Sequence, residues 1–297
     1  MELSGGEITD MLAETPGDSR GFRERVRATL TRLSRTGNLP ALPGVATAAL
    51  AIARDPDGDM KDLAKVLQTD VGLTACILRV ANSPAYGRRS EAHTVREAVM
   101  TVGLRRACDI LVAICAKQLY AGQGRYTEIL WNHSLVVAVA AEEVARVTRR
   151  VNPDTAFLPG LLHDIGRIAF RLADAQSFEA IQERVEAGEG ESTALERECY
   201  EFDHAQVGGI LTEDWGLTPE QCDAIRWHHE PDCADAGRDL ALLINAADSL
   251  AYAIGLGTYR EPPADVSVAA LGLSPDEEGA CAIRVREEFD AQKQLIG

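Results

Sequence analysis

The sequence predicts an all-α fold, a multi-helix bundle with an N-terminal helical subdomain. Ala and Leu are abundant, and runs of strand length that alternate polar and apolar residues are scarce. Apolar residues instead recur at helical spacing, as at Val136, Val137, Ala140 and Val144. These two observations favour helices from one end of the chain to the other.

The N-terminal helical part is expected over residues 21–121, after a flexible lead-in over residues 1–20 that is rich in Gly, Pro and acidic residues. Prolines punctuate the entry to its second helix, and the run "ARDPDGD" is typical of the loop that follows it. The helices expected here cover residues 21–35, 44–54, 59–70, 73–83, 93–104 and 105–121. The run "AGQGRYT" then marks a subdomain boundary near residue 122.

A helical core is expected over residues 122–258. The apolar stripe predicts a helix over 128–150, and Asn152, Pro153 and Asp154 are good first residues for the segment "NPDTAFLPGLLHDIGRIAF". Three pairs resemble capping boxes and predict further helix starts: Thr193 with Glu196, Asp203 with Gln206, and Thr218 with Gln221.

The last helices are bounded by proline and glycine. The helix after Thr218 is expected to reach Glu230 and to stop before Pro231. The run "RDLALLINAADSLAYAIG" predicts a helix that ends at Gly255. Residues 259–297 are expected to form a loop and then a C-terminal helix, which Ser274 begins.

Composition limits the classes of function. The 297 residues suffice for one large or two modest domains, and the net charge of −16 argues against nucleic acid as a partner. No apolar run approaches the roughly 20 residues needed to span a bilayer, so we expect a cytoplasmic protein without membrane contact. The seven cysteines form no CxxC pair and are expected to be mostly buried free thiols.

Polar side chains at apolar or helix-end positions are the main functional clue. Five of the six histidines fall between residues 133 and 229. The candidates are His133, His163, Asp164, His204, His228, His229 and Asp248. Each alone has an ordinary explanation, such as a core histidine that donates to a carbonyl or a histidine at a helix C-terminus. Taken together, a nitrogen and oxygen set of this kind suits Fe, Mn, Zn or Mg.

The order of these residues, with "HDIG" at its centre, resembles the HD superfamily of metal-dependent phosphohydrolases. Within it, the chain is most similar to the HDOD domain, the HD-related output domain of bacterial signalling proteins. The similarity begins near residue 38 and runs to about residue 255. It is carried by "LPALPGVATAAL", "LQTDVGLTACILRVANSPAYG", "VREAVMTVGLRRACDILVA", "LWNHS", "GLLHDIGR", "FDHAQVGGIL" and "IRWHHEP".

The resemblance implies an HD-like helical bundle and a metal site of one or two ions. By the family pattern, one ion is held by His133, His163, Asp164 and Asp248. Relatives with two metals add histidines that match His204, His228 and His229, with Asp164 as the bridge. Arg167 matches a position where related cyclic-di-GMP phosphodiesterases usually carry Lys, and is a candidate phosphate contact. No catalytic residue is assigned.

Three functions stay open at this point. The first is a regulatory HDOD module that binds metal or a nucleotide ligand and acts through signalling proteins. The second is a phosphohydrolase acting on a nucleotide or a cyclic dinucleotide. It is supported by the complete ligand series, which HDOD domains often lack, and opposed by the missing Gly-Tyr-Pro triplet after "HHEP". The third is a polar core without metal. The sequence predicts no oligomeric state.

Overall fold

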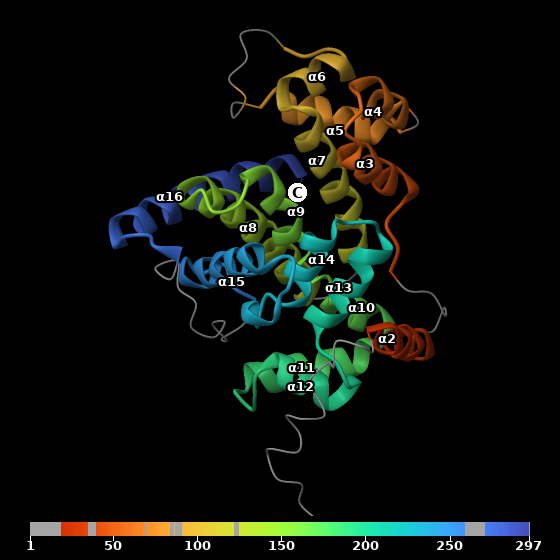
Figure 1. Ribbon diagram of the computed structural model, residues 1–297, viewed down its shortest axis with the longest axis vertical. Helices are drawn as coiled ribbons and strands as arrows, with labels where there is room; N and C mark the ends of the chain where they lie inside the picture. The colour runs from red at the N-terminus through yellow and green to blue at the C-terminus, as the bar shows by residue number, and fades with distance from the viewer. Residues whose placement is uncertain are drawn as a thin grey trace, which may run out of the picture.

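The computed structural model describes residues 19–34, 40–68, 70–83, 86, 91–121, 125–258 and 271–296. Every regular element in these ranges is a helix, as the sequence predicts. The N-terminal helices are α2 (Ser19–Leu33), α3 (Gly44–Arg54), α4 (Met60–Leu67), α5 (Val71–Ala81), α6 (Val95–Val102) and α7 (Leu104–Lys117). In Figure 1, α3 to α6 gather at one end of the molecule, and α7 runs from them into the rest of the bundle.

The remaining helices follow α7 in the chain, and two of them, α11 and α12, lie at the end of the molecule opposite α6 (Figure 1). They are η2 (Gln118–Tyr120), α8 (Arg125–Thr148), α9 (Pro153–Leu162), α10 (Ile165–Ala173), α11 (Ala175–Glu186), α12 (Ser192–Tyr200), α13 (His204–Asp214), α14 (Pro219–Arg226), η3 (Pro231–Cys233), α15 (Arg238–Ala253) and α16 (Pro275–Ile296). The helix α8 packs against α9, α15 and α16, so its face around Leu135 and Ala140 is fully buried.

Several helix boundaries agree with the sequence prediction, and at two of them the predicted capping box is formed. The bounds of α3 agree with the prediction, and the boxes at Asp203–Gln206 and Thr218–Gln221 are both formed. The start of α5 was predicted two residues late. The Asp70 side chain accepts the backbone N–H groups of Gly72 and Leu73, so the helix begins at Val71.

Two predictions about the core helices were wrong, and one segment divides at a point that was not predicted. The Thr193–Glu196 box does not exist, because α12 already begins at Ser192 and the Glu196 side chain is buried. The segment after Asn152 is two helices, since α9 ends at Leu162 and α10 begins at Ile165. The helix α14 ends at Arg226, so the stretch up to Glu230 is a turn.

The C-terminal helix joins the two parts of the bundle. The helix α16 packs against α8 and reaches α5, and the Lys117 ammonium donates to the Ile296 carbonyl over 3.0 Å. The lead-in up to residue 18, the centre of the expected joint (122–124) and the loop 259–270 lie outside the described residues. The subdomain boundary near residue 122 therefore stays a prediction.

The cysteines follow the expectation. Five of the seven are buried, Cys199 and Cys233 are exposed, and all seven thiols are free. Among the described helices, none combines the length and the apolar character that a bilayer-crossing segment needs.

One buried carboxyl in α7 predicts a pH effect on stability. Burial raises the pKa of Asp109 to about 7, although the charges of Arg106 and Arg105 lower it. The folded state then holds a proton that the unfolded state releases above about pH 4, so stability falls as pH rises from about 4 to 7. We expect the stability of Asp109→Asn not to fall over this pH range. At pH 8 its free energy of unfolding should exceed that of the wild type by on the order of 2 kcal/mol.

Urea unfolding at pH 5 and pH 8 measures this difference. The control is Asp290→Asn, which removes an exposed carboxylate from α16 and should keep the wild-type profile. Equal pH profiles for wild type and Asp109→Asn would contradict the prediction.

Candidate metal centre

The fold brings all seven predicted metal ligands into one buried cluster, which we call the His/Asp cluster. His133 lies on α8, His163 and Asp164 form the turn between α9 and α10, and His204 is the first residue of α13. His228 and His229 lie in the turn after α14, and Asp248 lies on α15. The cluster members are His133, His163, Asp164, His204, His228, His229 and Asp248. All but the half-buried His229 are at most 4% exposed.

Local breaks in the helices put these side chains in place. Between α9 and α10 the chain turns at His163 and Asp164, so two neighbouring residues both reach the cluster. The turn lies against the start of α13, because a Cβ on Gly166 would come within 2.0 Å of the His204 carbonyl oxygen. A glycine there lets the backbones that carry Asp164 and His204 approach one another.

Four imidazoles of the cluster share one orientation. The Nδ1 atoms of His133, His163 and His228 lie 3.2, 2.8 and 2.8 Å from the backbone carbonyls of Leu256, Gly160 and Ile225. The Nδ1 atom of His204 lies 2.7 Å from a carboxylate oxygen of Glu196. Since carbonyl and carboxylate oxygens only accept, each Nδ1 carries the proton, and each Nε2 points inward. Metal-binding histidines are fixed in this way by their outer nitrogen.

Two of the inward nitrogens have no hydrogen-bond partner. The Nε2 atoms of His163 and His228 are buried and make no hydrogen bond. Burial lowers the pKa of His163, and lowers that of His228 to about 3, so both rings are neutral. A buried lone pair without a donor is costly, and a bound cation would satisfy both atoms.

The cluster divides into two three-residue groups and a set between them. His204, His228 and His229 form the three-histidine group, and His133, His163 and Asp248 form the second group. His163, Asp164 and His228 make a third set that lies between the other two. Within each set, one ligand atom of every residue lies within 4.8 Å of the others. The arrangement suits one or two ions, with Asp164 placed between the groups.

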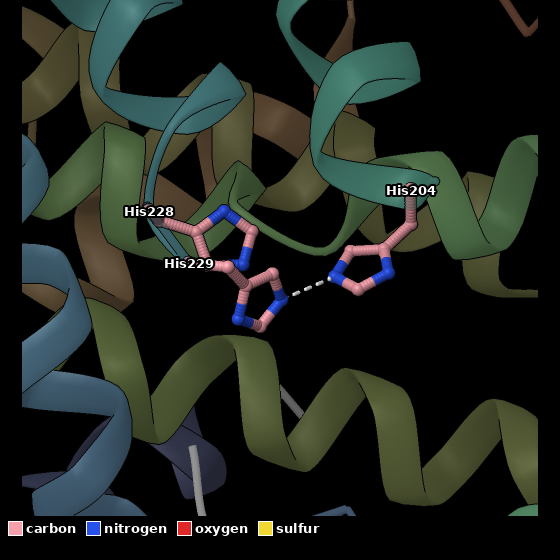
Figure 2. A group of neighbouring side chains, drawn as sticks. All are labelled: His204, His228 and His229. Carbon is pink, nitrogen blue, oxygen red and sulfur yellow. Dashed lines mark hydrogen bonds between the residues drawn. The ribbon is translucent and has the colours of Figure 1, made fainter. Parts of the chain in front are cut away.

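Figure 2 shows the three-histidine group, in which the His204 and His229 rings point their Nε2 atoms at each other. These atoms are 2.9 Å apart, and the two rings are nearly perpendicular at 89°. Burial and the neighbouring His228 hold the pKa of His229 well below its usual range. The proton between these two nitrogens therefore belongs to His204. Burial and Arg167 would lower the pKa of His204, but Glu196 and Asp164 raise it to about 9.

Asp164 is the most connected carboxylate of the cluster. Its Oδ1 atom lies 3.1 Å from Nε2 of His204, 3.1 Å from Nε of Arg167 and 3.6 Å from Nε2 of His163. Burial would raise the pKa of Asp164, but the charge of Arg167 and the two histidines hold it well below its usual range. Arg167, the candidate phosphate contact, thus lies beside the cluster and pairs with Asp164.

The second carboxylate of the cluster, that of Asp248, faces His133. Its Oδ1 atom lies 3.0 Å from Nε2 of His133, whose own proton is on Nδ1. A nitrogen lone pair and a carboxylate oxygen at this distance need a proton or a cation between them. Burial would lower the pKa of His133, but Asp248 raises it. Between His204 and Asp164, the proton on Nε2 of His204 occupies this place when no cation is bound.

The formal charges fit a divalent cation. The buried carboxylates of Asp164, Asp248 and Glu196 carry three negative charges, and the buried guanidinium of Arg167 carries one positive charge. With neutral histidines the centre therefore has a charge of −2, which one divalent ion or two protons would neutralise. Mixed imidazole and carboxylate ligands suit Fe, Mn or Zn.

Two polar residues beside the cluster, Glu196 and Asn245, were not predicted from the sequence. Glu196 accepts from both the backbone N–H and the Nδ1–H of His204. Asn245 donates from its amide to the His228 carbonyl over 2.7 Å. Asn245 precedes Asp248 by three residues on α15, so its helical position could have indicated a role. Glu196 offered a misleading signal, since its spacing from Thr193 resembles a cap.

A separate cavity lies away from the cluster. It has a volume of about 580 Å³, opens between α8 and α16, and contains no cluster residue in its lining. This cavity is therefore not part of the His/Asp cluster.

The HDOD domain family matches residues 39–231 of the chain. The chain belongs to the HDOD domain family. The match covers six of the seven cluster residues, and the structure adds Asp248 from beyond its end.

Solved structures support the same HDOD fold. An HDOD domain protein from Geobacter sulfurreducens is 25% identical, with a TM-score of 0.72 over 93% of this chain and 96% of that one. A protein from Marinobacter aquaeolei, whose name suggests signal transduction, is 21% identical, with a TM-score of 0.76 over 93% of this chain and 65% of its own. A protein from Shewanella amazonensis, whose name suggests a phosphohydrolase, is 22% identical, with a TM-score of 0.71 over 91% of this chain and 98% of its own.

A curated relative is an uncharacterised protein of Treponema pallidum. It is 25% identical over 197 residues, which is 66% of this chain. The chain spans 38% of the length of that relative.

Proposed function

We propose that this protein is a bacterial signalling protein whose HDOD domain binds one or two divalent metal ions and acts through protein partners. The observation that carries the metal proposal is the common orientation of the four imidazoles, each held through Nδ1 with Nε2 directed inward. A polar core without metal has no need for two buried, partnerless Nε2 atoms.

The burial of the cluster favours a regulatory role. His163, His204 and His228 are each at most 1% exposed, and Arg167 is paired with Asp164. Ions held there would stabilise the junction of α8, α13 and α15, because the candidate ligands come from these helices and from the turns after α9 and α14. The Marinobacter protein of similar fold, whose name suggests signal transduction, supports the same class of function.

The residues that would hold the metal are those of the two groups. His133, His163 and Asp248 would hold one ion, and His204, His228 and His229 a second, with Asp164 between them. When bound, a divalent ion at such a site supplies a strong positive charge that polarises a bound oxygen. Glu196 and the three backbone carbonyls hold the outer nitrogens, and Arg167 balances the charge of Asp164.

Metal analysis of the purified full chain tests the proposal. We expect one to two equivalents of Fe, Mn or Zn in protein prepared without chelator, and less than a tenth of this in Asp164→Ala. The isosteric Asp164→Asn keeps the shape around Arg167 and should lose metal as well. The control Asp232→Ala removes a carboxylate whose side chain is 89% exposed and should keep its metal.

The result against the proposal is wild-type protein that holds no metal and gains no thermal stability from added Mn²⁺, Fe²⁺ or Zn²⁺. Circular dichroism of each variant shows whether the helices are intact. Metal content lost without loss of helix supports the site.

A phosphohydrolase is the second candidate. The observation in its favour is that Asp164 lies between two adjoining ligand groups, as a centre for phosphoryl chemistry requires. The metal-loaded chain is incubated with nucleotides and cyclic dinucleotides. Turnover that Asp164→Ala abolishes would favour the enzyme. Metal-loaded protein without turnover would favour the regulatory module.

A further inference from the structure

The helix α12 holds the two segments that carry the three-histidine group. In Figure 1, α11 and α12 lie at the far end of the molecule, and α12 contacts mainly α11. Yet two consecutive residues of α12 reach back to the cluster. Glu196 contacts His204 directly, and Arg197 contacts the residues beside His204 and His229.

Glu196 contacts one ligand twice. A single carboxylate oxygen, Oε2, lies 2.8 Å from the backbone nitrogen of His204 and 2.7 Å from its Nδ1 atom. Glu196 is 1% exposed, and its other oxygen is buried without a hydrogen-bond partner. Burying a carboxylate with one oxygen unsatisfied costs free energy, so ordinary core packing does not account for this residue.

Arg197 holds the two ends of the same group. Its Nε atom donates to Asp203 over 2.7 Å, and a terminal nitrogen donates to Glu230 over 3.0 Å. Asp203 directly precedes His204, and Glu230 directly follows His229. The guanidinium thus ties the start of α13 to the turn after α14.

His204 differs from the other three oriented imidazoles in its outer partner. His133, His163 and His228 use backbone carbonyls of their own or neighbouring segments, whereas His204 uses a charged side chain from another helix. A carboxylate is a stronger acceptor than a carbonyl and makes the opposite nitrogen of the ring a better metal ligand.

We propose that Glu196 is a positioning residue that sets the metal affinity of the three-histidine group, and that it links α12 to occupancy of that group. This inference rests on the proposed metal binding. By thermodynamic linkage, if the contact strengthens metal binding by some factor, bound metal strengthens the contact by the same factor.

The first test compares two variants of α12. Glu196→Gln keeps the shape but removes the charge, and we expect its Zn²⁺ affinity to fall about 10–100-fold. The matched control is Glu198→Gln, which removes the same charge from the same helix but lies at the surface, where it pairs with Arg184. Zn²⁺ affinity is measured by competition with a chromophoric chelator, starting from metal-free full chain.

A double-mutant cycle separates positioning from a general structural effect. If Glu196 acts through His204, Glu196→Gln should have no further effect on Zn²⁺ affinity in a His204→Ala background. An equal loss of affinity in both backgrounds would overturn the inference.

Hydrogen exchange of the wild-type chain tests the linkage without any substitution at Glu196. We expect Zn²⁺ to slow exchange at least fivefold in the peptide 192–204, which contains the His204 amide bound by Glu196. Absence of this protection in protein that binds Zn²⁺ would overturn the inference while leaving the proposed function in place. Wild-type protein that binds no Zn²⁺ would instead refute the proposed function.

Discussion

Gly166→Ala is expected to destabilise the fold by about 3 kcal/mol or more, because the added methyl group has no space. A Cβ at this position would lie 2.0 Å from the carbonyl oxygen and 2.8 Å from the Cα atom of His204. These atoms belong to the backbone, so no side-chain rotation relieves the clash. The helices α10 and α13 would have to separate.

The same substitution should weaken the metal centre. Asp164 lies two residues before Gly166, and its contact with His204 spans the α10–α13 junction over 3.1 Å. Separation of the two helices would lengthen this contact. Urea unfolding measures the stability, and the metal content of the folded fraction measures the site.

The control is Gly279→Ala on α16. A Cβ there meets nothing within 4 Å, and alanine favours a helix over glycine by up to about 1 kcal/mol. We therefore expect Gly279→Ala to be neutral or stabilising. Equal effects of the two substitutions would show that the α10–α13 approach is looser than the structure indicates.

The helices could be predicted from the sequence where the signal is local. Asp203 and Thr218 form the boxes that their spacing indicates, and the apolar stripe of α8 is buried. The break between α9 and α10 was not predicted, because the apolar segment "LPGLLHDIGRIAF" contains no proline or capping signal at His163 and Asp164. The break lies beside the close approach of Gly166 to the His204 backbone, which is a tertiary contact without a local sequence signal.

The identity of the cluster residues could be predicted, but their arrangement could not. The order of polar residues and the family resemblance indicate the seven candidate ligands, and the fold gathers all seven. Their outer partners are mostly backbone carbonyls, which carry no sequence signal. Glu196 is the exception, and its spacing from Thr193 suggested a cap, so its role required the structure.

Removal of metal is expected to lower the thermal midpoint of the wild-type chain by about 4–7 °C. At metal concentrations of 100 to 1,000 times the dissociation constant, binding to the folded state alone adds about 3–4 kcal/mol. For a chain of this size, each kcal/mol moves the midpoint by about 1.6 °C.

The size of this effect follows from where the ligands come from. His133 and Asp248 of one group belong to α8 and α15, and His204 and His228 of the other belong to α13 and the turn after α14. Each group joins segments that are distant in sequence, so each site exists only in the folded state. Without metal, the lone pairs of His163 and His228 are buried and unsatisfied. Bound metal therefore both adds ligand bonds and removes a cost of burial.

Differential scanning fluorimetry with and without chelator measures the shift. Asp164→Ala serves as the reference, since a chain that has lost the residue between the two groups should show little shift on chelation. A shift of similar size in wild type and Asp164→Ala would place the metal outside the His/Asp cluster. A shift confined to wild type would assign the stabilisation to the seven residues that the fold brings together.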